Sequence, residues 1–339
     1  MKRTAMNLLT ICLIPLSGCE RNDLCYDHPH ENLHVSVVWR FIPDELQSSL
    51  PEGVRISMYA AQQACRQQSG SNYTYYRDTY GGNIKVQDGM YDFLLFNSDT
   101  EMIQLRGTES LYTAEAYLGS RTRTPYTKGA SDKSICYSNT SCANLHTRNE
   151  TLMAEPDRFF ATYCSLETVQ TYGKTVSDTI YAYPRSRVLH VTLKVKVKGL
   201  EGAVSCRASL SGVARSVSLA TGECTGETGT AIFDMDKADN SFLSKAINVF
   251  GLVHSPYNIP EEERIQHIVQ LEFRMKDNSV AGYEFEISDQ IDFDAIEPEV
   301  VIPIVVEEVE LPEVEIPDAP GGGFDANLTD WGEEVEIIL

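Results

Sequence analysis

The sequence predicts an all-β protein: two antiparallel β-sandwiches in tandem, followed by an acidic C-terminal tail. Three observations predict this class. Apolar and polar residues alternate with a period of two through many short segments. Gly, Pro, Asn and Asp separate these segments, and helical periodicity is scarce. A length of 339 residues is enough for roughly two domains, each with its own core.

The first predicted sandwich covers residues 31–175. Its clearest strands are residues 33–41 (LHVSVVWRF) and 54–59 (VRISMY), which are rich in β-branched and aromatic residues. Residues 84–96 predict two more strands joined by a tight turn. Residues 121–151 are polar and contain Gly, Ser and Asn, so they predict a long loop or an insertion.

The second predicted sandwich covers residues 185–295, after a boundary near 170–187. It begins with residues 188–197 (VLHVTLKVKV), the strongest alternation in the chain. Helices are expected at only two places. Residues 44–50 predict one or two turns, and residues 238–247 predict a short helix.

An internal echo links the two halves. Leu33–Val37 (LHVSV) resembles Leu189–Leu193 (LHVTL), and each segment would open its half as a first strand. A five-residue match is short, but it favours two sandwiches of related plan.

The N-terminus predicts a lipoprotein signal peptide over residues 1–18. Lys2 and Arg3 precede the apolar segment Met6–Leu16, which is shorter than the roughly 20 residues that a membrane-spanning helix needs. Small residues then lead to Cys19, the predicted acceptor of lipid such as palmitate, with residues 19–30 as a linker. Two or more acyl chains would hold the chain durably at a membrane. The alternative is an ordinary secreted protein in which Cys19 is a plain thiol or part of a disulfide.

The acidic charge is concentrated in a tail over residues 296–339. The whole chain has a formal net charge of −21, which argues against nucleic acid as a partner. Pro303 lies within the apolar run 300–306 and predicts an edge strand or an extended segment. The end of the tail is strand-like and either packs on its own domain or donates a strand to another subunit. The candidate partner-strand residues are Phe324, Trp331, Val335, Ile337 and Leu339.

Seven cysteines remain after Cys12 and Cys19 are set aside. Export makes disulfides plausible, and the odd number leaves at least one cysteine without a partner in the chain. The candidate pairs are Cys136 with Cys142 and Cys206 with Cys224.

Motifs for catalysis or cofactor binding are missing from the sequence. It contains no GxSxG, HExxH or GxxxxGK[ST] pattern, so no enzyme activity and no cofactor are predicted. Asp27, His28 and His30 are chemically able to bind a metal, but a metal site is not the main reading. A tyrosine cluster supports the alternative function of glycan binding, because exposed aromatic rings stack on sugars. Its members are Tyr73, Tyr75, Tyr76 and Tyr80.

Several segments resemble an uncharacterised lipoprotein family of Bacteroides-type bacteria, DUF5119-like and related to the fimbrial anchor subunits of type V pili. The most specific is Asp23–His30 (DLCYDHPH), shortly after Cys19. Gly82–Asn97, Pro156–Phe160, Leu210–Ala214 and the end that contains Trp331 add weaker likeness across most of the chain.

The resemblance implies a fold and a role. It implies two transthyretin-like sandwiches, display on the outer membrane, and assembly with other surface subunits through a donated strand. Polymerising relatives are trimmed after an Arg near the first strand; Arg40 and Arg55 are present here, without a clear match. A first strand that is never cut would suit an anchor or accessory subunit.

Overall fold

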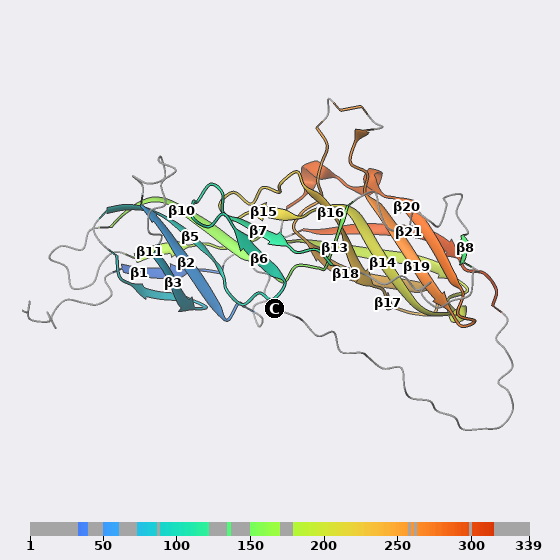
Figure 1. Ribbon diagram of the computed structural model, residues 1–339. Helices are drawn as coiled ribbons and strands as arrows, with labels where there is room; N and C mark the ends of the chain where they lie inside the picture. The colour runs from blue at the N-terminus through green and yellow to red at the C-terminus, as the bar shows by residue number, and fades with distance from the viewer. Residues whose placement is uncertain are drawn as a thin grey trace, which may run out of the picture.

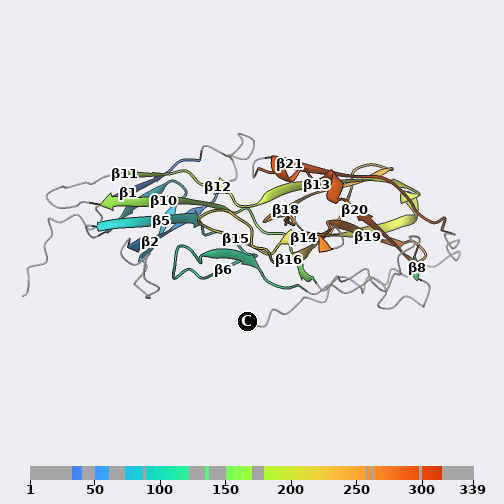
Figure 2. The same ribbon diagram turned by 90° about the horizontal axis from the view of Figure 1, so that it is seen from above.

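The structure, a computed structural model, describes residues 33–39, 50–60, 73–86, 89–121, 134–136, 150–169, 179–256, 259–260, 263–297 and 300–314. Strands β1 to β21 and three short 3-10 turns make up the regular structure of these residues. The all-β class is therefore confirmed. The molecule is elongated, with the two halves of the chain end to end (Figure 1, Figure 2).

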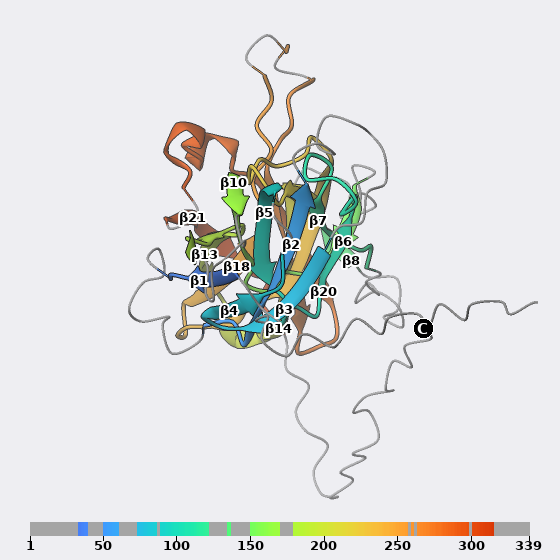
Figure 3. The same cartoon turned by 90° about the vertical axis from the view of Figure 1, so that its left-hand side faces the viewer.

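The first half is one curved sheet of eight strands in the order β11-β1-β4-β3-β2-β5-β10-β12. Seen end on, its strands curve around an interior (Figure 3). The interior is a core to which β1, β2, β5 and β11 contribute buried side chains. The strands are β1 (Leu33–Val37), β2 (Gly53–Ala60), β3 (Tyr73–Asp78), β4 (Gly81–Ile84), β5 (Gly89–Asn97), β10 (Phe160–Val169), β11 (Thr179–Ala182) and β12 (Arg185–Ser186).

The second half consists of two sheets. One has the strand order β17-β18-β13-β21 and the other β8-β20-β19-β14-β16-β9. The strands are β8 (Ser134–Cys136), β9 (Thr151–Met153), β13 (Leu189–Lys198), β14 (Ala203–Ala214), β16 (Thr228–Asp234), β17 (Asp236–Lys237), β18 (Phe242–Val249), β19 (Ile268–Met275), β20 (Val280–Glu286) and β21 (Val301–Glu310). Alternate residues of β13 are buried as predicted, because one face of the strand covers the larger core.

The short helix expected within residues 238–247 is wrong, because β18 occupies Phe242–Val249. Leu243, Ile247 and Val249 are buried there, and all eight residues of the strand face residues of β13. Pairing with β13 therefore overrides the local helix preference. The other expected helix, at 44–50, lies almost wholly outside the described residues.

A small fourth sheet joins the halves. Its order is β15-β7-β6, from β6 (Ile103–Arg106), β7 (Glu115–Leu118) and β15 (Ser216–Ser218). The segment between β7 and β10, where a loop or insertion was predicted, supplies β8 and β9, and these flank the six-stranded sheet of the second half. The larger core is correspondingly continuous from Phe96 and Ile103 into the second half. The halves are thus interlocked rather than joined by a simple linker.

The three larger sheets are mixed rather than purely antiparallel, whereas the joining sheet is antiparallel throughout. Four of the strand pairs are parallel: β1 with β11, β13 with β21, β16 with β9 and β20 with β8. A parallel pair needs a long connection between its strands. Here the intervening strands of each half provide that connection for the first two pairs.

Candidate assembly surfaces

The first strand, β1, is held on both sides. It pairs in parallel with β11 and antiparallel with β4. Leu33, Val35 and Val37 are 1%, 0% and 3% exposed. The segment that follows the predicted lipid site Cys19 therefore continues into a core strand.

Gly81 lets β4 approach this strand closely. Its φ is +88°, and an added Cβ would lie 2.1 Å from the carbonyl oxygen of Val35. Only glycine adopts this conformation without strain and leaves this space. Gly81 therefore forms part of the seat of β1, that is, the two strands β4 and β11 that hold β1 on both sides.

The first strand of the second half, β13, lies in an equivalent seat. It pairs in parallel with β21, the last described strand, and antiparallel with β18. His190 Nδ1 is 2.8 Å from Asn248 Oδ1, and His34 Nδ1 is 2.7 Å from Asn83 Oδ1 in the first half. The Leu-His-Val echo thus marks two equivalent strands: each has one antiparallel neighbour and one parallel neighbour.

Strand β21 forms the edge of its sheet, as Pro303 predicts. Ile302, Ile304 and Val306 are buried. The first part of the acidic tail is thus built into the second half. At the end of the strand, Glu308 forms ion pairs with Lys198 and with Lys196, at 3.7 Å for the latter.

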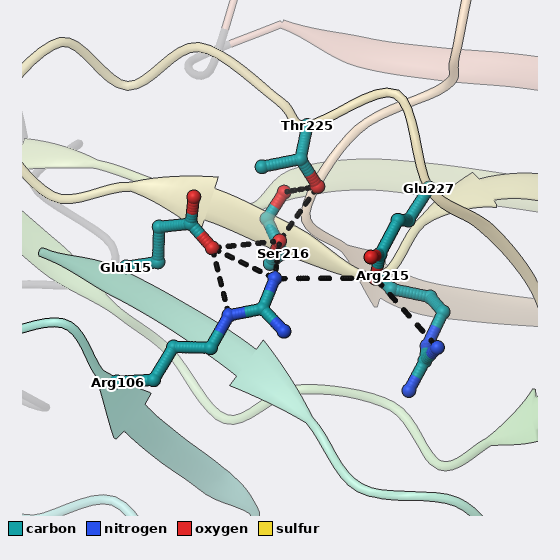
Figure 4. A network of polar contacts seen from close by, with 6 residues as sticks. All are labelled: Arg106, Glu115, Arg215, Ser216, Thr225 and Glu227. Atoms are coloured by element: carbon teal, nitrogen blue, oxygen red, sulfur yellow. Dashed lines mark hydrogen bonds and ion pairs between the residues drawn. The ribbon is translucent and has the colours of Figure 1, made fainter. Parts of the chain in front are cut away.

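A polar network ties the first half to the second at the small joining sheet (Figure 4). Arg106 Nη2 on β6 lies 2.8 Å from Glu115 on β7 and 3.3 Å from Ser216 Oγ on β15. Ser216 Oγ is also 2.6 Å from Thr225 Oγ1, and Glu227 lies 3.7 Å from Arg215. These contacts fix the register of β15 against β7.

Arg187 adds a second tie where the chain passes from β12 to β13. Its Nη2 donates to the carbonyl oxygens of Leu219 and Ala220 at 3.2 and 3.4 Å. Burial, together with the charge of Arg185, lowers the pKa of Arg187 to about 10, so it stays cationic at neutral pH. Gly222 leaves room for this guanidinium, because an added Cβ would lie 2.3 Å from Nη1.

The predicted bridge between Cys206 and Cys224 is wrong, because neither sulfur is in a disulfide. Cys206 is buried in β14 and its Sγ donates to the Arg207 carbonyl oxygen at 3.6 Å. Cys224 Sγ instead donates to the Phe250 carbonyl oxygen at 3.3 Å. Strand β14, which holds Cys206, pairs with β16 and β19 and not with the segment around Cys224. Cys136 lies in β8, while its predicted partner Cys142 lies outside the described residues.

Most of the other predicted site residues lie outside the described residues. These are Cys19, Asp27, His28, His30, Phe324, Trp331, Val335, Ile337 and Leu339. Within the part of the chain that the structure describes, no group of three or more His, Cys, Asp and Glu side chains is arranged to hold a metal ion. No helix in that same part is long and apolar enough to span a membrane.

The tyrosine cluster forms part of the first half's surface. Tyr73, Tyr76 and Tyr80 are 45%, 61% and 66% exposed. Arg55 lies over the Tyr76 ring, 5.9 Å from its centroid. Tyr75 instead donates its hydroxyl to the Lys85 carbonyl oxygen.

Together, the two seats and the joining sheet define a two-part all-β protein whose first strand is built into its core. A family model described as "Domain of unknown function (DUF5119)" matches residues 18–234. This is well over half of the chain, so the protein belongs to that family.

Comparison with curated and solved proteins gives two kinds of likeness. Fim4B of Bacteroides ovatus, named as a fimbrium anchoring subunit, is 34% identical over 121 residues. That match covers 35% of this chain and 34% of Fim4B, so it spans about a third of the relative. A crystal structure from the same species, titled as an adhesin, has a TM-score of 0.54 at 22% identity and covers 90% of this chain and 99% of that one. It shares the fold. The fimbrial anchor protein Mfa2 of Porphyromonas gingivalis has a TM-score of 0.45 at 9% identity, covering 81% of this chain and 88% of Mfa2.

Sequence reasoning missed three features. These are the parallel pairing of β1 with β11, the interlocking strands β8, β9 and β15, and the two hydrogen bonds between the Gln290 side chain and the Val305 main chain on β21. The Leu-His-Val echo indicates that β1 and β13 correspond, but not which strands they pair with. All three features depend on contacts between residues far apart in the chain.

Proposed function

We propose that this protein is a non-enzymatic, lipid-anchored surface protein that acts as a fimbrial anchor or accessory subunit. The observation that supports this most is the seat of β1. Leu33 is the fifteenth residue counted from Cys19, and the strand that it begins is paired on both sides and buried. The likeness to Fim4B supports the fimbrial role.

In this proposal, residues 1–18 are removed and lipid on Cys19 holds the mature chain at the outer membrane, facing the cell surface. Residues 19–30 form the linker, the two interlocked halves form the body, and residues 296–339, whose first strand β21 is built into the second half, form the tail. Cutting the chain before β1 would separate the lipid from the body, so the uncut chain is the form that anchors.

Cys19 is tested by labelling cells with palmitate. The wild-type chain should incorporate label and remain with the membrane, whereas Cys19→Ala should lose both properties. Ser17→Ala is the matched control and should keep them. A mature surface protein that starts after Cys19, or an unlabelled wild-type chain, would overturn the anchor proposal.

Partners are engaged by strand donation from the end of the tail, residues 324–339. This segment places Phe324, Trp331 and the run 335–339 (VEIIL) among acidic residues, and an extended segment can add to the sheet edge of another protein. Deletion of 324–339 should abolish co-purification with fimbrial subunits while palmitate labelling continues. Replacing Asp325 and Asp330 by Asn should leave co-purification intact. Full co-purification after the deletion would contradict strand donation.

Glycan binding is the second candidate, favoured by the exposed rings of Tyr73, Tyr76 and Tyr80. Aromatic faces present large, rigid contact surfaces with a polar end. A glycan array should give hits that Tyr76→Ala and Tyr80→Ala remove. An array without hits would eliminate this function.

A further inference from the structure

Strand β21 has an outer edge that differs from every other edge in the described part of the chain. It has ten residues, whereas the other edge strands of the four sheets have four or fewer. A long edge presents a row of main-chain donors and acceptors to which another strand can bind. This edge therefore needs protection more than the others do.

The side chains along β21 make the edge attractive to another strand. Val300, Val301 and Val305 are 45%, 52% and 47% exposed. Residues 300–306 (VVIPIVV) carry no charge, in a chain whose net charge is −21. Two copies of this segment can approach each other without the repulsion that acts between the rest of their surfaces.

At the centre of this edge, the side chain of Gln290 forms hydrogen bonds with the main-chain groups of β21. Gln290 Nε2 donates to the Val305 carbonyl oxygen at 3.1 Å, and Gln290 Oε1 accepts from the Val305 N–H at 2.9 Å. A neighbouring strand would make this same pair of hydrogen bonds. Gln290 is exposed and ends the short 3-10 turn η5 (Ser288–Gln290).

Two further features close the edge. Successive residues of a strand direct their N–H and C=O groups to opposite edges, so Pro303 faces the same edge as Val305 and offers no donor there. Near the end of the strand, the Tyr283 hydroxyl donates to the Glu310 carbonyl oxygen. The centre and the end of the edge are thereby blocked.

We propose that Gln290 is a latch that prevents β21 from pairing with β21 of a second copy of this chain. Antiparallel pairing about a two-fold axis centred on Pro303 places Val301 of one copy opposite Val305 of the other, so the surface is self-complementary. The latch and the missing donor of Pro303 prevent this dimer, which leaves the chain monomeric at this edge.

The test measures the association state of the mature chain, residues 19–339, with Cys19→Ser so that no lipid contributes. Wild type should elute as a monomer in size-exclusion chromatography with light scattering. Gln290→Ala combined with Pro303→Val should double the measured mass, and each single change should give a smaller, concentration-dependent increase.

Adding Val305→Lys to the double variant is the matched control. A lysine at a paired edge position opposes strand addition, so the mass should return to that of a monomer. Far-UV circular dichroism verifies that each variant is folded. A folded double variant that remains a monomer at every concentration overturns the proposal. Association that Val305→Lys does not reverse also overturns it, because the contact then lies on another surface.

Discussion

The seats of β1 and β13 have the same arrangement of neighbouring strands, but they differ in the length of the strand on the parallel side. Both strands begin Leu-His-Val, both pair antiparallel with a strand that supplies an Asn to the His, and both have a parallel edge neighbour. In the first half that neighbour, β11, has four residues. In the second half it is β21, with ten. The comparison teaches that one arrangement of strands can have two uses: the first seat holds the strand nearest the proposed lipid site Cys19, and the second builds the start of the tail into the body.

Gly81→Ala should have the largest effect, because the first seat depends on a close approach that the second does not require. The residue that faces Thr192 in the second seat is already an alanine, Ala246. At Gly81 a Cβ would meet the Val35 carbonyl oxygen in a backbone conformation with positive φ. We expect a loss of about 4 kcal/mol in the free energy of unfolding, from strain plus overlap, measured by urea denaturation. Gly226→Ala is the control, since an added Cβ there has nothing within 4 Å. Equal stability of both variants would mean that the seat of β1 is looser than described.

Acid should weaken the second half selectively, because it contains the fully buried His267. Burial lowers the pKa of His267 to about 4; the charge of His254 acts in the same direction and the Gly212 backbone opposes it. The unfolded chain therefore binds more protons than the folded chain between about pH 4 and 6.5. Stability from this group is present above pH 6.5 and is lost as the pH falls through that window, by about 3 kcal/mol. Unfolding by urea at several pH values should show this slope, and His267→Gln should remove it. His254→Gln, at an exposed position, should retain most of it, and an unchanged slope in His267→Gln would contradict the assignment.

Val35→Ala and Val191→Ala compare the two cores directly. Each valine lies in the first strand of its half and is 0% exposed. Each change should cost about 2 kcal/mol, from lost burial and the cavity left behind. Ser36→Ala and Thr192→Ala, at the adjacent outward positions, serve as controls with small effects. A cost at Val191 but none at Val35 would mean that β1 leaves its seat readily.

Asn83→Ala and Asn248→Ala should have the smallest effects. Asn83→Ala removes one hydrogen bond to His34, whereas Asn248→Ala removes the bond to His190 and also the 3.4 Å bond from Asn248 Nδ2 to the Pro156 carbonyl oxygen. A loss of about 1 kcal/mol is expected for Asn83→Ala and a somewhat larger loss for Asn248→Ala, both measured by thermal unfolding. A larger loss at Asn83 than at Asn248 would show that the two seats are less alike than their geometry suggests.

The sequence by itself determined the all-β class, the two-part plan and the edge position of the segment around Pro303. These follow from local chemistry: alternation in residues such as Leu189–Lys198 predicts a strand with one buried face, and a proline removes a donor wherever it stands. The Leu-His-Val echo even indicated which two strands correspond.

Only the tertiary structure decided which distant segments meet. It paired β1 with β11, used the segment between β7 and β10 to flank the second half, replaced the expected Cys206–Cys224 bridge with separate contacts, and brought Gln290 to Val305. None of these contacts leaves a periodic signal in the chain. Each depends on how whole sheets curve and pack, because burial of the shared core, rather than local preference, selects the pairing.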